Sequence, residues 1–141
     1  MTVNSYPMLV AGTLSAIAAF LHLLIIVGGA TWYRFFGAGE QMAQMAEVGS
    51  IYPGAVTLAI AAVLGVWALY GFSAAGLITA LPFMKLALVL ISLIYLFRAL
   101  AGLAMYFAVA GHGSFMLYSS LICLLYGLAY TLGTWQLWSE L

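Results

Sequence analysis

Long apolar stretches dominate the chain and are separated by three shorter polar or glycine-rich connections. The apolar stretches cover residues 7–27, 53–72, 82–105 and 114–138. Each is close to the roughly 20 residues that an α-helix needs to cross a bilayer core about 30 Å thick. The pattern predicts an all-α membrane protein with four transmembrane helices. Because these helices take up most of the chain, it also predicts one integral membrane domain over residues 1–141.

The connections predict how these helices are arranged. Residues 73–81 and 106–113 form short connections, so consecutive helices are expected to be antiparallel neighbours in an up-and-down four-helix bundle. Four spans place both ends of the chain on one side with the second connection, and the first and third connections on the other. Pro7, Pro53 and Pro82 mark three helix starts, where a missing backbone N–H costs least.

The first connection is the longest and contains a helical pattern of its own. Glu40, Gln44 and Glu47 fall within about 60° of one another at helical spacing, and Met42 and Met45 lie opposite. The pattern predicts a short amphipathic helix over about residues 39–49, lying at the membrane surface.

Composition supports a lipid environment and excludes several functions. The 141 residues are 67% hydrophobic and 4% charged, against about 25% charged in soluble domains. The formal net charge of zero gives no sign of nucleic-acid binding. The chain has no aspartate and a single cysteine, Cys123, interpreted as a packing residue. The first apolar stretch is too long for a secretory signal peptide and lacks a basic start, so it is expected to be retained.

Small residues recur at helical spacing along three of the apolar stretches, and such stripes let helices approach closely in lipid. Packing within the chain is the favoured interpretation, with a homodimer or a larger assembly as the alternative. The stripes consist of Gly12, Ser15, Ala19 and His22; Thr57, Ala61 and Gly65; and Ser119, Cys123 and Gly127.

The few polar side chains are predicted to gather at one end of the bundle. At 1.5 Å per residue, Arg98 lies roughly 24 Å after Pro82, and His22 lies roughly 22 Å after Pro7. Both positions are on the side of the first and third connections. A polar pocket is therefore expected there, with these candidate ligand-binding residues: His22, Arg34, Glu40, Glu47, Thr57, Tyr95, Arg98 and Tyr118.

Arg98 is expected to pair with Glu40 or Glu47, because a carboxylate offsets the cost of an intramembrane guanidinium better than lipid does. This ion pair would hold the surface helix against the bundle. The alternative is that Arg98 reaches the headgroups by itself and that the glutamates form a solvated face. His22 is interpreted first as a hydrogen-bonded packing residue, and His112 as an exposed loop residue.

These features favour a non-catalytic membrane protein that binds a small or lipidic molecule, with an anionic molecule as one option, or that serves as an accessory subunit or transport component. The alternative is a membrane enzyme acting on a lipid or quinone-like substrate, with His22 or Glu47 as general base and Arg98 as electrostatic stabiliser. No catalytic motif or metal site is predicted. A b-type haem is disfavoured because its only candidate ligands are His22 and His112. The expected partners are membrane lipids.

The segments "WYRFFGAGEQMAQMAE" and "YPGAVTLAIAAVLGVWALYGFSAAGLITALP" lie in the first two-thirds of the chain. Their pattern resembles a family of small four-span bacterial inner-membrane proteins that carries no assigned activity. The resemblance implies the bacterial inner membrane as location and four spans as architecture, and it assigns no role to any residue.

Overall fold

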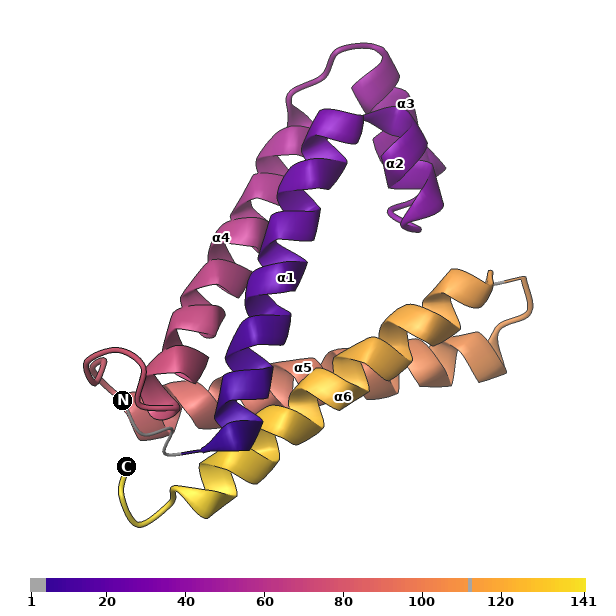
Figure 1. Cartoon of the computed structure of the whole chain (residues 1–141). Helices are drawn as coiled ribbons and strands as arrows, with labels where there is room; N and C mark the ends of the chain where they lie inside the picture. Colours follow the sequence, from indigo (N-terminus) through magenta and orange to yellow (C-terminus); the bar gives the residue numbers. More distant parts are fainter. Residues whose placement is uncertain (1–4, 112) are drawn as a thin grey trace. The chain divides into compact units, whose positions relative to one another are not determined.

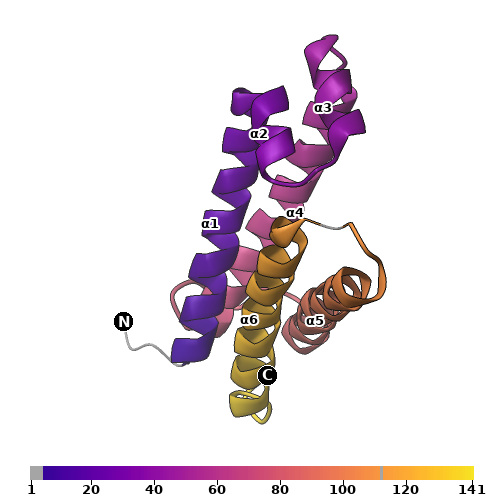
Figure 2. The same cartoon turned by 90° about the vertical axis from the view of Figure 1, so that its right-hand side faces the viewer.

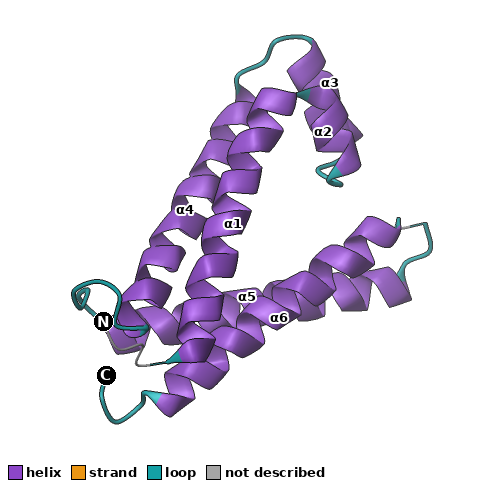
Figure 3. Cartoon of the chain, viewed as in Figure 1, coloured by secondary structure: helices purple, strands orange, loops and turns teal. Residues whose placement is uncertain are grey.

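The chain is helical in nearly all of the part described by its computed structural model, residues 5–111 and 113–141 (Figures 1 and 3). Within these residues four helices are long and apolar enough to cross a membrane. The all-α class and the four membrane-spanning helices predicted from the sequence are confirmed. The helices are α1 (Tyr6–Gly28), α2 (Ala30–Phe35), α3 (Glu40–Glu47), α4 (Tyr52–Ala74), α5 (Met84–Ala108) and α6 (Ser114–Gln136).

Prolines mark the starts of two of these helices as expected. Pro7 and Pro53 are the second residues of α1 and α4, where the ring restricts φ without removing an intrahelical hydrogen bond. Pro82 instead precedes α5, which begins only at Met84. The reason is Phe83, whose φ of 55° is left-handed and cannot continue an α-helix.

The first connection contains two helices rather than the one predicted. The amphipathic segment forms α3, Glu40–Glu47, as expected. The additional helix α2 starts after Gly29, whose φ of 69° ends the helical path of α1. At six residues, α2 is too short to show a hydrophobic period, so the sequence pattern does not predict it.

Two compact units make up the chain. The larger unit contains Met1–Ser15 and Val66–Leu141, and the smaller unit contains Ala16–Gly65. In the smaller unit, α2 and α3 contact one another. Their shared core with α1 consists of Ile25, Tyr33 and Ala43, with Leu21, Ala30, Phe36, Met42 and Ala46 packed against it.

Parts of all four spanning helices pack together in the larger unit. A Cβ added at Gly71 of α4 would lie 2.6 Å from the Cα of Gly12 in α1. One added at Gly127 of α6 would lie 2.7 Å from a methyl carbon of Leu96 in α5. Glycine is therefore needed at these crossings, and the packing interpretation of the stripes is confirmed for Gly12 and Gly127. A Cβ at Gly65 would meet nothing within 4 Å.

Within the larger unit α5 and α6 run in opposite directions, as predicted for consecutive helices. Figures 1 and 2 both show α5 and α6 side by side, joined by a short connection. The hydroxyl of Ser5 donates to the side-chain carbonyl of Gln136 over 3.3 Å. This bond places the start of α1 at the end of α6.

Candidate functional site

The candidate residues form two sets, one in each unit. His22, Arg34, Glu40, Glu47 and Thr57 belong to the smaller unit, and Tyr95, Arg98 and Tyr118 to the larger unit. The geometry of each set is described by itself, and the single pocket that would hold both stays a prediction.

Arg34 binds both acidic side chains of the smaller unit. Its Nε and Nη2 atoms donate to the two carboxylate oxygens of Glu40 over 2.9 and 2.7 Å, and Nη1 donates to Glu47 over 2.6 Å. Arg34 is in the last turn of α2, and the glutamates are the first and last residues of α3. The planar guanidinium thus joins the two helices through a bidentate contact with Glu40 and a single hydrogen bond with Glu47.

The electrostatic effect of this cluster is visible in two pKa values. Hydrogen bonding to Glu40 and then to Glu47 raises the pKa of Arg34 above its usual value. The hydrogen bonds from Arg34 lower the pKa of Glu40. All three side chains remain partly exposed, so solvent screens these interactions.

Arg98 is the partner expected for the glutamates from the sequence, whereas within the smaller unit Arg34 binds both carboxylates. Arg98 belongs to the larger unit, so its own pairing with Glu40 or Glu47 stays a prediction. Depth along the spans does not indicate the pairing with Arg34, because the pairing depends on α2, which presents its guanidinium within a few residues of α3. With two carboxylates against one guanidinium, the cluster carries a formal charge of −1. Arg34 is therefore poorly suited to hold an anionic ligand.

Beneath this cluster, buried hydroxyls connect α2 to α4. Thr57 donates to the carbonyl of Pro53 over 2.7 Å, so its oxygen accepts the hydroxyl hydrogen of Tyr33 over 3.0 Å. Thr57 thus has a packing role, and Tyr33 is a buried partner that is not among the residues selected from the sequence. No sequence signal distinguishes a tyrosine that turns inward from one in an aromatic belt.

His22 is satisfied within its own helix. Its Nδ1 atom lies 2.7 Å from the carbonyl oxygen of Ala18, and because a carbonyl only accepts, Nδ1 carries the hydrogen. The half-buried ring fits the interpretation of His22 as a hydrogen-bonded packing residue.

Arg98 is held by neutral oxygen atoms. Its Nη1 and Nη2 atoms donate to Ser120 over 3.3 Å and to Ser119 over 3.4 Å. Both serine hydroxyls donate to the carbonyl of Met116, which leaves their lone pairs for the guanidinium. The side chain of Arg98 remains exposed, and three of its five N–H groups form no bond with these serines.

Gly102, one turn after Arg98 on α5, provides the space for this arrangement. A Cβ at this position would overlap both the guanidinium of Arg98 and the hydroxyl of Ser120. The absence of a side chain therefore lets the guanidinium lie against the backbone of α5 beside α6. The role of Gly102 has no signal in the sequence, because it depends on the rotation of two helices relative to one another.

Tyr95 lies in the packed interior of the larger unit, 5% exposed, rather than beside an open space. Tyr130 donates to the Trp67 carbonyl over 2.8 Å, so it accepts from Ser15 over 3.1 Å, and Ser15 accepts from Tyr95 over 2.9 Å. Each hydroxyl has a single hydrogen, so the chain of bonds runs in one direction, from Tyr95 to Trp67.

The remaining candidates add little to these sets. Tyr118 is 60% exposed, and among the described residues no hydrogen bond joins it to Arg98. His112 lies outside the described residues. Within the described part of the chain, no group of three or more histidine, cysteine or acidic side chains is placed to hold a metal ion.

Comparison of the chain with models of protein families, with curated proteins and with solved structures finds no match.

Proposed function

We propose that this integral membrane protein binds an anionic amphiphile, such as a lipid or fatty acid, and that Arg98 holds the charged headgroup. The binding is non-catalytic: the ligand is retained rather than converted. The observation that supports this proposal is an exposed guanidinium fixed by two neutral serine hydroxyls.

The position of Arg98 along α5 supports a ligand that combines a charge with an apolar tail. From Arg98 to the end of α5 at Ala108 is 108 − 98 = 10 residues, or about 15 Å of helix. The side chain extends toward that end, because Gly102, Ser119 and Ser120 surround its guanidinium. A headgroup at this level would leave its tail beside the apolar surface of the spanning helices.

The energetics favour an anion there. An arginine near the centre of a span costs about 2.5–3.5 kcal/mol on insertion scales. Two long hydrogen bonds to neutral oxygens offset only part of this cost, since bonds to ionised acceptors are about twice as strong. The sequence of the larger unit has one acidic residue, Glu140, which follows the C-terminal end of α6. A bound anion would supply the negative charge that balances the guanidinium of Arg98.

Native mass spectrometry of the detergent-purified full chain tests this proposal. Phosphatidylglycerol and phosphatidylcholine with identical acyl chains are the probes. R98Q is expected to lower phosphatidylglycerol retention about fivefold, the effect of one cation near a membrane surface, and to leave phosphatidylcholine retention unchanged. R98K should keep part of the retention, because it keeps the charge and loses the bidentate geometry.

Two further variants sharpen the result. G102A places a methyl group where the guanidinium lies, so it should lower phosphatidylglycerol retention as R98Q does while the charge is intact. Y118F removes a neighbouring exposed hydroxyl and serves as the matched control. Wild-type retention of phosphatidylglycerol by R98Q would refute the proposal.

The resemblance of residues 32–47 to four-span inner-membrane proteins supports a bacterial inner-membrane location as part of this proposal. The roles as accessory subunit or transport component, and assembly as a homodimer or larger complex, stay predictions. The enzymatic alternative also stays a prediction. The contacts of its two candidate bases give it no support, because His22 is bonded to its own helix and Glu47 is bonded to Arg34.

A further inference from the structure

A second feature of the larger unit lies at the opposite end of α5 and α6 from the guanidinium of Arg98. A groove of about 270 Å³ follows the seam between these two helices, lined among others by Val89, Leu93, Leu96 and Trp135. Its position on spanning helices exposes it to the hydrocarbon part of a bilayer.

The groove is apolar although three hydroxyl side chains line it. Ser92, Thr131 and Thr134 each donate to the backbone carbonyl four residues earlier in their own helix, over 2.7 Å. Their hydrogens are thereby occupied, and methyl and methylene groups form the walls. Such a surface suits a hydrocarbon chain and offers little to a polar ligand.

A cation lies beside Trp138, one of the residues that line this groove. The ammonium group of Lys85 is 4.4 Å from the centre of the ring of Trp138, and Trp138 also lines the groove. Lys85 is the second residue of α5, and Trp138 follows the end of α6. Both residues are therefore at helix ends, where a spanning helix meets the membrane interface. Among the described residues no carboxylate forms an ion pair with Lys85, so its three N–H groups remain available to a ligand.

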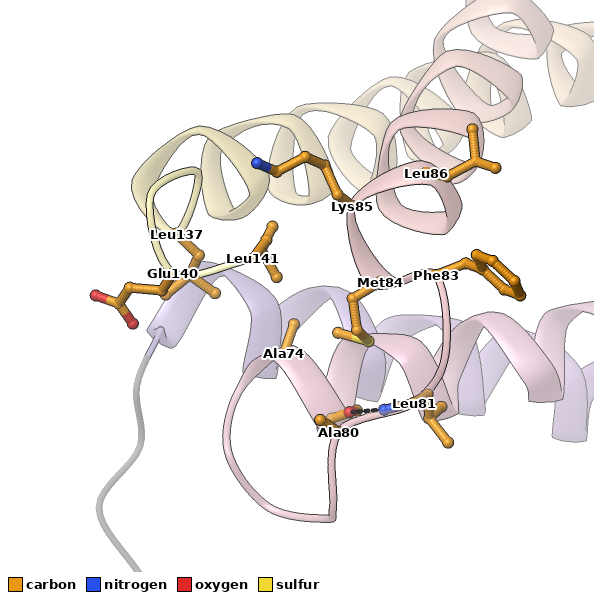
Figure 4. Close-up of a pocket in the computed structure, with 11 residues that line it drawn as sticks. Ala74, Ala80, Leu81, Phe83, Met84, Lys85, Leu86, Leu137, Glu140 and Leu141 are labelled. Carbon is orange, nitrogen blue, oxygen red and sulfur yellow. Dashed lines mark hydrogen bonds between the residues drawn. The ribbon is translucent and has the colours of Figure 1, made fainter.

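The same lysine lines a wider hollow of about 590 Å³ beyond the helix ends (Figure 4). Glu140 is at its rim, with its carboxylate directed outward (Figure 4). Most of the remaining wall is apolar, including Leu81, Met84 and Leu137. The volume is within the range of about 300–1,000 Å³ typical of small-molecule sites. The wall includes one positive and one negative side chain, Lys85 and Glu140.

We propose that this corner is a binding site for a glycerophospholipid with a zwitterionic, primary-amine headgroup. The phosphate contacts Lys85, the ammonium group contacts Glu140, and an acyl chain occupies the groove between α5 and α6. This site is separate from the one proposed at Arg98, and it differs in headgroup preference.

Charge complementarity selects this headgroup over two others. A net-anionic headgroup such as phosphatidylglycerol meets Lys85 favourably but brings no cation to Glu140, where its negative charge is repelled. Phosphatidylcholine has a quaternary ammonium without N–H groups, so it forms no hydrogen bond with the carboxylate. Phosphatidylethanolamine supplies both a phosphate and an N–H donor.

Native mass spectrometry of the full chain with phosphatidylethanolamine, phosphatidylcholine and phosphatidylglycerol of identical acyl chains tests the proposal. K85Q is expected to lower phosphatidylethanolamine retention about fivefold, and K85R should restore it, because the cation and its contact with Trp138 are kept. E140Q should remove the preference for phosphatidylethanolamine over phosphatidylcholine. Unchanged retention of phosphatidylethanolamine by K85Q, or equal retention of these two lipids by the wild type, would overturn the proposal.

The two proposed sites can fail separately. R98Q acts on retention of phosphatidylglycerol, and K85Q acts on retention of phosphatidylethanolamine, so each lipid reports on one end of α5. V89W, which fills the groove without changing any charge, should weaken retention of phosphatidylethanolamine. If V89W had no effect, the acyl chain would not lie in the groove, and the proposed lipid pose would be refuted.

Discussion

Replacing Tyr130 by phenylalanine removes one hydroxyl from the interior of the larger unit with almost no change in volume. Tyr130 is fully buried, and its hydroxyl both donates to the Trp67 carbonyl and accepts from Ser15. These bonds join α6 to α4 and to α1. We expect Y130F to lower the free energy of unfolding by the value of two interhelical hydrogen bonds.

The magnitude follows from the number of bonds. Interhelical hydrogen bonds in membrane proteins contribute about 0.6 kcal/mol each and at most about 1.7, so Y130F should cost about 1.2 kcal/mol. The penalty stays near this value because Ser15 can turn its hydrogen to a carbonyl of its own helix. Y95F removes one bond, the donation from Tyr95 to Ser15, and should cost about 0.6 kcal/mol.

Unfolding of the purified chain in mixed micelles, titrated with SDS, measures these differences. Y70F is the matched control, since Tyr70 donates to the Pro82 carbonyl in an exposed position where water can replace the bond. It should be nearly neutral. The reasoning is refuted if Y95F costs as much as Y130F, because the directed chain of hydroxyls from Tyr95 to Trp67 would then be wrong.

Two other predictions concern the glycine crossing and the ion cluster. G71A should destabilise the fold by about 1–3 kcal/mol, because the added methyl group would lie 2.6 Å from the Cα of Gly12; G65A on the same helix, where nothing lies within 4 Å, is the matched control and should be neutral or stabilising in the same SDS titration. Arg34 holds the pKa of Glu40 below its usual value, so the contact stabilises the fold at neutral pH and is lost as the pH falls below about 4.5 through the folded-state pKa. Hydrogen-exchange protection of α3, corrected for intrinsic rates, should therefore fall from pH 7 to pH 3 in the wild type and change less in E40Q; equal pH responses would contradict this.

The four spans and α3 could be predicted from the sequence because their signals are local. A run of about 20 apolar residues has few alternatives to a transmembrane helix, and eight residues from Glu40 to Glu47 suffice to show an amphipathic period. Gly12 and Gly127 could also be predicted as packing positions, because small residues at helical spacing let helices approach closely in lipid.

The candidate site was harder to predict because its contacts depend on rotation as well as depth. Arg98, Ser119 and Gly102 meet only because α5 and α6 turn particular faces to one another, and hydropathy contains no information on that angle. The pairing of Glu40 with Arg34 depends on the six-residue helix α2, whose length is below that of a recognisable period. Burial of Tyr33 likewise depends on tertiary packing.

The two cationic side chains of α5 have a mechanical consequence. Lys85 and Arg98 are 98 − 85 = 13 residues apart, about 20 Å along the axis, and they extend toward opposite ends of the helix. Sliding α5 along the bilayer normal would draw one of these charges toward the hydrocarbon whichever way it moved. The α5–α6 hairpin should therefore meet a thinner bilayer by tilting or by thickening the lipid around it, which makes its inclination a readout of membrane thickness.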